Sequence, residues 1–410
     1  MRGAGQMSAD ILVTKEKCCG CKLCAQVCPK NAITYQMDAL GACYPSIDES
    51  KCIGCKKCAN ICPAEKNLKN AESVCFAAVN RDESVLMRSA SGGVFSAVAS
   101  AILKDGGVVY GAAAMHDEKL LLRVAHKRIT SCFELSDLQR SKYVQSDMEG
   151  IYSLIRKDLK DGKTVFFSGT PCQVAAVKSL CGEPDNLLLG DIICHGVPSQ
   201  KLFSEYLQTL SHDKSKKIEN FYFRTKESGW GLCARLITLN RRGKIRSRRI
   251  PCNISSYYKM FLRCETYRDA CYSCPYATRE RVGDLTMGDF WGLEKAASTY
   301  AACKENHVAL TNGVSCVLAN TPKGLAYLQK ADLLLMKAEF DDIARENGQL
   351  LHPSPLPKSR EGIIDLYAQA GYEGLERQFN RALGVKKYII LLRNRVSPKI
   401  RMKIKTILGK

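Results

Sequence analysis

No stretch of this 410-residue sequence reads as a membrane span. The apolar run Tyr388-Ile389-Ile390-Leu391-Leu392 is far shorter than the roughly 20 residues that a spanning helix needs. The sequence opens Met1-Arg2-Gly3-Ala4-Gly5-Gln6, without the apolar core of a secretion signal. These absences argue against an integral membrane protein and against a secreted one. We therefore expect a cytoplasmic protein whose residues 1–10 are disordered.

Acidic residues are scarce: 41 Asp and Glu stand against 61 Lys and Arg, a formal net charge of +20. Such a balance favours an acidic protein partner, a polyanionic substrate or an anionic membrane. Motifs with interleaved basic and aromatic residues are missing, so we expect no nucleic acid. Residues 386–410 hold nine bases and no acid, with apolar residues between them. That pattern is typical of a segment lying on the inner face of a membrane, and equally of a solvated tail.

Cysteine, by contrast, is abundant, with 22 residues. Disulfide scaffolds reach this density in short secreted chains, which this chain is not. Eight cysteines form two copies of one pattern, Cys-x-x-Cys-x-x-Cys-x-x-x-Cys-Pro, at residues 18–29 and 52–63. This run holds paired 4Fe–4S clusters in bacterial ferredoxins, and the fourth cysteine of each copy reaches across to the other cluster. The doubled spacing favours clusters over tetrahedral zinc.

The pattern assigns four thiolates to each cluster. The first cluster takes Cys18, Cys21, Cys24 and Cys62, and the second takes Cys28, Cys52, Cys55 and Cys58. Cys19 and Cys43 fall outside both copies, and we expect them to be turn residues. Two neighbouring clusters carry single electrons over a short distance, so the remainder of the chain should hold a group that exchanges electrons with them.

Periodicity divides the chain into three regions and predicts an α+β protein. Residues 11–70 form the ferredoxin-like domain, 72–355 a mixed domain of strands and helices, and 356–410 a helical, basic C-terminal region. In the mixed domain we expect strands at 74–79, 107–111, 120–124, 164–168, 187–193, 219–224, 232–239 and 244–250, and helices at 147–160, 172–181 and 199–211.

Four further cysteines follow predicted strands or lie in a loop. Thr170 is a good helix N-cap and Pro171 a good first helical residue, so Cys172 falls in the first turn, where amides and the helix dipole favour a thiolate. Cys194 follows the next strand, and Cys271 and Cys274 form a Cys-x-x-Cys loop. Spacing leaves two interpretations open: a third cluster, or two core cysteines with a zinc-binding or bare Cys-x-x-Cys.

Several motifs in order resemble a known family. They begin at Ser91-Gly92-Gly93, Ser141-Lys142-Tyr143, Gly169-Thr170-Pro171-Cys172, Cys194-His195-Gly196, Cys271-x-x-Cys274 and Asp284-Leu285-Thr286-Met287-Gly288-Asp289. Over about residues 1–360 the chain resembles the beta subunit of coenzyme F-420 hydrogenase/dehydrogenase, fused to a two-cluster ferredoxin. The resemblance implies a third 4Fe–4S cluster on Cys172, Cys194, Cys271 and Cys274, bound FAD, and hydride exchange with a deazaflavin. Cys264, an extra thiol near the loop, is a candidate to replace one of these ligands.

The resemblance also implies where a flavin binds. The turn Ser91-Gly92-Gly93 opens a predicted helix whose amides would approach a phosphate, with Lys142 and Tyr143 as phosphate and ring contacts. Asp284 and Asp289 are candidates for a ribose contact or for ordering the cluster loop, and Asp289 is equally a candidate for only capping a turn. Trp230 would stack on a ring or pack in the core, and His195 would bond a cluster sulfur, relay a proton or only pack. No Gly-x-Gly-x-x-Gly fingerprint is present, so a Rossmann site is excluded.

These assignments predict an iron–sulfur flavoprotein oxidoreductase. Electrons would pass from a low-potential, acidic, ferredoxin-like donor through the clusters and FAD to an organic hydride acceptor such as a deazaflavin. Two alternatives stay open: a reductase of a sugar or lipid-linked intermediate at the membrane surface, and a non-catalytic electron-transfer module for a partner enzyme. The sequence singles out no catalytic residue.

Overall fold

A computed structural model describes residues 12–70, 73–117, 121–211, 217–227 and 229–395. Residues 1–10, which were expected to be disordered, lie outside these ranges. Of the basic segment 386–410, only α15 (Lys386–Arg395) is described. No helix among the described residues has both the length and the apolarity to cross a membrane.

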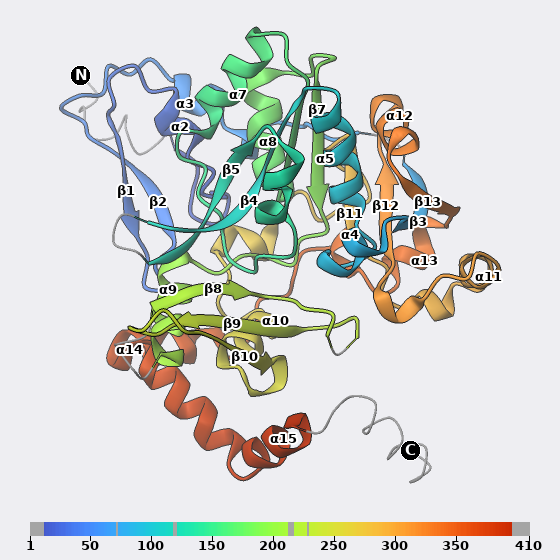
Figure 1. Cartoon of the computed structure of the whole chain (residues 1–410). Helices are drawn as coiled ribbons and strands as arrows, with labels where there is room; N and C mark the ends of the chain where they lie inside the picture. The colour runs from blue at the N-terminus through green and yellow to red at the C-terminus, as the bar shows by residue number, and fades with distance from the viewer. Residues whose placement is uncertain (1–11, 71–72, 118–120, 212–216, 228, 396–410) are drawn as a thin grey trace.

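An eight-stranded mixed sheet forms the centre of the molecule (Figure 1). Its spatial order is β13-β3-β12-β11-β7-β6-β4-β5, in which β4, β6, β7 and β11 run parallel. The buried parallel strands β6 and β7 are nearly continuous apolar runs, as expected where both faces are covered. The bounds are β3 (Val74–Asn80), β4 (Val108–His116), β5 (Leu122–Ile129), β6 (Val165–Gly169), β7 (Leu187–Ile192), β11 (Leu285–Asp289), β12 (Ser315–Ala319) and β13 (Leu333–Lys337).

Helices cover both faces of this sheet. On one face, α5 (Val94–Lys104), α6 (Leu135–Leu138) and α12 (Pro322–Lys330) contribute to a core with β4 and β12. On the other, α7 (Ile151–Lys160) and α8 (Pro171–Cys181) pack on β6 and β7. At the antiparallel edge, α11 (Ala297–Glu305) and α13 (Phe340–Ala344) enclose a third core, and α4 (Glu83–Arg88) lies beside β3.

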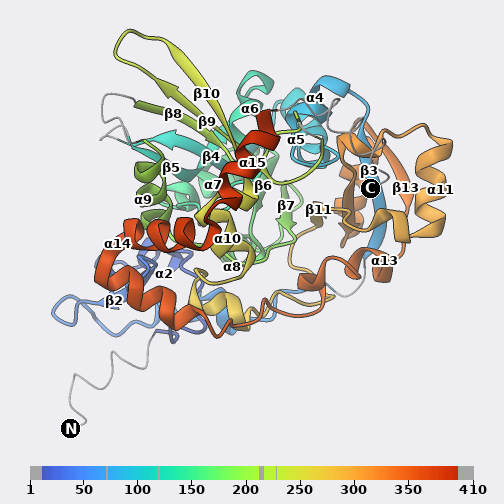
Figure 2. The same cartoon turned by 90° about the horizontal axis from the view of Figure 1, so that it is seen from below.

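A second, three-stranded sheet has the order β10-β9-β8. Its strands are β8 (Lys217–Tyr222), β9 (Cys233–Leu239) and β10 (Ile245–Pro251). One face packs on an aromatic core shared with α9 (Gln200–Leu210), α10 (Ser256–Leu262) and α14 (Arg360–Leu383). From below, α14 is seen to run along α9 and α10 (Figure 2).

The N-terminal region is ferredoxin-like. It holds α2 (Leu23–Gln26), the antiparallel pair β1 (Ile33–Met37) and β2 (Cys43–Ile47), and α3 (Lys57–Asn60). Cys21 and Leu23 pack into the same core as α7 and α8, so this region is joined to the main sheet by buried apolar contacts. Short 3-10 helices lie at 63–65, 132–134, 252–254, 269–273, 293–295, 310–312 and 348–350.

The predicted α+β class is confirmed: an N-terminal ferredoxin-like region accompanies a larger mixed-sheet domain. All eight predicted strands are present within a few residues of the expected bounds, apart from longer β4 and β5. The helix expected at 147–160 begins later, at Ile151. Gly150 precedes it with φ of 74°, a left-handed conformation that stops the helix from extending toward Asp147.

Candidate functional site

Three parallel strands end at one edge of the large sheet. β6 ends at Gly169, β7 at Ile192 and β11 at Asp289. Open α/β sheets bind ligands at this carboxyl edge. Thr170 follows β6 as the N-cap of α8, with Pro171 as its first residue, as the sequence predicted. Cys172 therefore lies in the first turn of α8, and Cys194 follows β7 at the same edge.

The Cys-x-x-Cys loop is held against this edge by a buried ion pair. Arg281 Nη2 lies 2.8 Å from Asp191 Oδ1, and both side chains are almost wholly inaccessible to solvent. Arg281 Nη1 also donates to the carbonyl of Tyr276 at 2.6 Å. Because Asp191 belongs to β7 and Tyr276 follows Cys274, one guanidinium fixes the loop relative to the strand that leads to Cys194.

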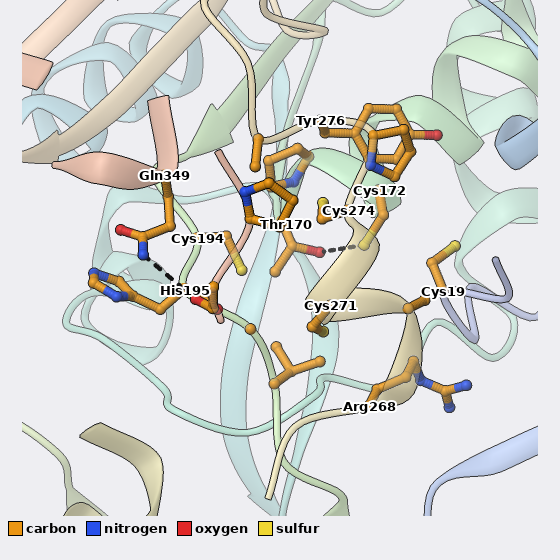
Figure 3. A pocket seen from close by; sticks show the side chains of 18 of the residues that line it. Cys19, Thr170, Cys172, Cys194, His195, Arg268, Cys271, Cys274, Tyr276 and Gln349 are labelled. Atoms are coloured by element: carbon orange, nitrogen blue, oxygen red, sulfur yellow. Dashed lines mark hydrogen bonds between the residues drawn. The ribbon is translucent and has the colours of Figure 1, made fainter. Parts of the chain in front are cut away.

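The four cysteines proposed as ligands of a third cluster line one cavity, which we call the thiol cavity. Figure 3 shows Cys172, Cys194, Cys271 and Cys274 around it, contributed by α8, the loop after β7 and the 3-10 helix 269–273 with its end. Cys19, from the ferredoxin region, lines the same cavity. Within the described part of the chain, no group of three or more His, Cys, Asp or Glu is placed so that it could hold a single metal ion.

Burial disfavours the ionised thiolate form of these cysteines. It raises the pKa of Cys271 to about 12 and that of Cys274 to about 11, and it raises the pKa of Cys194 as well. The backbone amides of Tyr276 and Ala277 donate toward the Cys274 sulfur and act in the opposite direction. Thiols that need a cation to ionise, with amides directed at their sulfur, are a donor set that fits a 4Fe–4S cluster.

Cys264 is not part of this cavity. Its backbone has φ of 59°, and its carbonyl accepts a hydrogen bond from the Tyr272 hydroxyl. It does not line the thiol cavity, so its placement does not favour the suggested replacement of a ligand.

The ferredoxin cysteines lie close to one another in the N-terminal region. One small cavity is lined by all four cysteines assigned to the second cluster, Cys28, Cys52, Cys55 and Cys58. In the other set, burial and then the neighbouring thiols Cys18 and Cys62 raise the pKa of Cys24 to about 12. The Cys21 carbonyl accepts a hydrogen bond from the Tyr152 hydroxyl at 2.8 Å, which anchors this set to α7.

Sequence reasoning missed Cys19, which was expected to be a turn residue. It directly follows Cys18, and its side chain contacts that of Cys172. Arg268 holds this turn in place: its Nη1 donates to the Cys18 carbonyl at 3.2 Å and its Nη2 to the Cys43 carbonyl at 2.6 Å. The adjacent pair Cys18-Cys19 was the only hint in the sequence. The contact could not be predicted because Cys172 lies about 150 residues away in the chain.

A second cavity, of about 530 Å³, lies beside the first, and we call it the large cavity. Its volume is within the roughly 300–1,000 Å³ of small-molecule sites. Of the residues predicted to contact a flavin, Ser91, Gly93, Lys142 and Tyr143 line it, whereas Gly92 and Asp284 do not.

Packing explains where the predicted residues lie. A side chain on Gly92 would collide with the backbone of β3, 2.0 Å from the Ala78 carbonyl, so this glycine is required by internal packing. Lys142 Nζ donates to the carbonyls of Asp137, Leu138 and Gln139, and burial lowers its pKa to about 7. Its ammonium therefore caps the end of α6 beside the cavity.

Asp284 and Asp289 are separated by the length of β11. Asp284 precedes β11, where its carboxylate accepts hydrogen bonds from the Leu189 amide and the Thr321 hydroxyl. Asp289 ends the strand and lines the large cavity. Arg224 lies 2.6 Å from the Asp289 carboxylate, and Trp230 Nε1 donates to it at 2.8 Å. Trp230 stacks on Trp291 at 4.5 Å between ring centroids, and Trp291 lines the cavity.

The two cavities share a wall. Thr170 and the loop from Cys194 to Val197 line both of them, so a proposed ligand, Cys194, and its neighbour His195 belong to the shared wall. Burial lowers the pKa of His195, and Asp289 opposes that effect. The arrangement suits the passage of electrons from a metal cluster to an organic group.

Two family models match the sequence. Residues 17–66 match the 4Fe–4S dicluster domain, and residues 162–339 match the C terminus of the coenzyme F-420 hydrogenase/dehydrogenase beta subunit. The fold and the dicluster domain thus define an iron–sulfur electron-transfer protein of the oxidoreductase class. The match over residues 162–339 confirms the resemblance to the coenzyme F-420 hydrogenase/dehydrogenase beta subunit that was seen in the sequence.

A solved chain is also similar, from a xenon derivative of the F-420-reducing NiFe hydrogenase complex of Methanosarcina barkeri. It is 15% identical, with a TM-score of 0.39, over 78% of this chain and 94% of that one. No curated protein matches.

Proposed function

We propose that this chain is an iron–sulfur flavoprotein that passes electrons from a low-potential donor, through three 4Fe–4S clusters and FAD, to an organic hydride acceptor such as a deazaflavin. The two ferredoxin clusters would use the ligands assigned from the spacing, and the third would use the four cysteines of the thiol cavity other than Cys19. The proposed regions are 11–70 for the ferredoxin domain, 72–355 for the oxidoreductase domain and 356–410 for the C-terminal region.

The observation that carries this proposal is the wall shared by the two cavities. A cluster bound by Cys194 would lie one residue layer from any molecule in the large cavity, because the loop from Cys194 to Val197 faces both. A flavin, when bound, supplies the conversion between single electrons and a hydride. The protein's part is to hold both groups on opposite sides of this loop and to exclude water between them.

The large cavity has features that support a flavin. Tyr143 is held edge-on to Phe223 and Tyr258, at centroid distances of 5.7 and 5.9 Å, so its ring has a fixed position beside the cavity. Gly93, with φ of 86°, opens α5 at the cavity wall and directs the first amides of an 11-residue helix there. Helix N-termini of this kind bind phosphate groups.

The test is anaerobic purification with iron, sulfide and flavin quantified per chain. Three cubanes and one flavin predict about twelve irons and about one FAD. About eight irons would remove the third cluster from the proposal, and a flavin-free chain that takes up no added FAD would remove the hydride step. Reduction of a deazaflavin by the reduced holoprotein would support that acceptor, whereas electron transfer only to a co-purified protein would support the module alternative.

A further inference from the structure

A row of arginines crosses the second sheet. In the antiparallel register of β8, β9 and β10, Tyr222 pairs with Arg235, and Arg235 pairs with Arg249. Paired residues on antiparallel strands project from the same face. The alternate positions Phe221, Leu236 and Ile250 face the aromatic core. Tyr222, Arg235 and Arg249 therefore share the opposite face of this sheet.

Arg140 joins this row to the large cavity. It lines the cavity, and its guanidinium stacks over the Tyr222 ring at 4.3 Å from the centroid. Its backbone has φ of 69°, a left-handed conformation that is uncommon for a residue with a long side chain. Strained positions of this kind gather at ligand sites, where the surrounding structure maintains them.

The row concentrates positive charge at a cost to the fold. Like charges directly opposite each other on paired strands destabilise a sheet, and Arg235 and Arg249 are such a pair. Burial, with Arg249 and Arg140 as neighbours, lowers the pKa of Arg235. Glu227 forms an ion pair with Arg235, yet the buried Arg235 Nε has no hydrogen-bond partner among the described residues. An anion with several oxygens would offset this repulsion.

We propose that Arg140, Arg235 and Arg249 bind a phosphate or diphosphate group of a molecule that occupies the large cavity, and that this molecule is the hydride acceptor. This inference rests on the proposed function and adds the substrate class, a phosphorylated organic acceptor. Guanidinium forks match phosphate oxygens in pairs, and the three arginines, one of them paired with Glu227, leave two positive charges to complement a group with two or more negative ones.

The same chemistry has a second source, the diphosphate of FAD itself, and the experiment separates the two. Binding of inorganic pyrophosphate is measured by calorimetry on flavin-loaded and flavin-depleted full-length protein. The variants are Arg235→Gln, Arg249→Gln and the charge-keeping Arg235→Lys. The matched control is Arg246→Gln, which removes the same charge from an exposed position on the other face of β10.

We expect flavin-loaded wild type to bind pyrophosphate, and each Gln variant to weaken it about tenfold, as for the loss of a charged hydrogen bond. Arg235→Lys should retain part of the affinity, and Arg246→Gln should match wild type. If the Gln variants keep FAD, the site serves the acceptor. If they lose FAD and only flavin-depleted protein binds pyrophosphate, the arginines bind the flavin's diphosphate and the acceptor assignment is overturned.

No pyrophosphate binding in either form, or equal weakening by Arg246→Gln, would overturn the anion site altogether. These measurements need no electron transfer. Failure of this inference therefore leaves the iron and flavin counts unaffected, and failure of the proposed function appears in those counts and not in the titration.

Discussion

The ring of His126 shows how one residue of the cavity wall is fixed. It stacks on Phe167 at 4.9 Å, and Ser146 Oγ lies 2.9 Å from its Nδ1. Its Nε2 lies 3.1 Å from the Ser168 carbonyl, which only accepts, so Nε2 carries the proton and Nδ1 accepts from Ser146. Burial lowers the pKa of His126 to about 4. The histidine is therefore a neutral part of the wall of the large cavity.

This histidine should make the protein less stable in mild acid. Its pKa is about 6.5 in the unfolded chain and about 4 in the folded one, so protons bind the unfolded state first as the pH falls. Between pH 7.5 and 5.5 the free energy of unfolding should drop by about 1 kcal/mol through this group. Anaerobic urea titrations should show that His126→Gln lacks this part of the slope, whereas the exposed His352→Gln retains it. Equal slopes in wild type and His126→Gln would contradict the assignment.

Removal of a single cysteine from the thiol cavity should remove one cluster. Cys271→Ala removes one of four thiols, and a cubane held by four protein ligands is expected to be lost with it. Iron should fall from about twelve to about eight per chain, while the ferredoxin clusters remain. Cys181→Ala, at the far end of the helix that carries Cys172, is the matched control and should keep all the iron. Unchanged iron in Cys271→Ala would show that Cys271 is not a ligand.

For single residues, the sequence predicted correctly those features that depend only on adjacent residues in the chain. Thr170 and Pro171 define the start of α8 through local capping rules, and both positions were predicted correctly. Asp284 and Asp289 looked equivalent in one motif. The extended strand between them carries them to opposite ends of β11, and only Asp289 reaches the cavity.

At the scale of elements, the segment from Arg268 to Arg281 joins two parts of the molecule. Arg281 anchors its end to β7, and Arg268 anchors its start to the ferredoxin region. Arg268 also donates to the Gln145 side chain at 3.2 Å and stacks on Tyr44 at 4.5 Å. Its guanidinium is thus shared among three segments that are distant in the sequence.

Arg268→Ala should loosen this junction. The substitution removes the Arg268 donor from the buried Cys18 carbonyl and the partly buried Cys43 carbonyl, which should lower the free energy of unfolding by about 3 kcal/mol. Limited proteolysis should then cut the ferredoxin region sooner than in wild type. Arg263→Ala, an exposed arginine a few residues away, should have no such effect. Similar proteolysis of the two variants would argue against a special role for Arg268.

Elements were easier to predict than the pairing of their residues. Apolar runs predicted β6 and β7, because strands that are buried on both faces require such runs. Register is set by contacts across strands, so nothing in the sequence placed Arg235 opposite Arg249 or brought Arg140 over Tyr222.

At the scale of the whole molecule, the thiols form a sequence of sites. The cavity of Cys28, Cys52, Cys55 and Cys58 is followed by the set with Cys18, then by the thiol cavity, and then by the large cavity. Thiols of neighbouring sites in this series lie close enough to affect one another's pKa. Cys58 and Cys62 each raise the pKa of Cys24, after burial and Cys18, and Cys172 raises that of Cys18, after burial. The order of the sites matches the direction of transfer that we propose.

Cys19 connects two of these sites. One peptide bond joins it to Cys18, a proposed ligand of the first ferredoxin cluster, and its side chain contacts Cys172, a proposed ligand of the third. Residues that contact a metal ligand without binding the metal typically change activity 10–100-fold when removed. Cys19→Ala should therefore keep about twelve irons and slow electron transfer from the ferredoxin clusters to the third cluster at least about tenfold.

Rapid-freeze electron paramagnetic resonance would measure that rate, by following the ferredoxin signals after partial reduction of the protein. Cys43→Ala is the matched control, because Cys43 lies in the same region, outside both cysteine motifs, and its carbonyl also contacts Arg268. A loss of about four irons in Cys19→Ala would make Cys19 a ligand in its own right. An unchanged rate would mean that electrons enter the thiol cavity by a path that does not involve this residue.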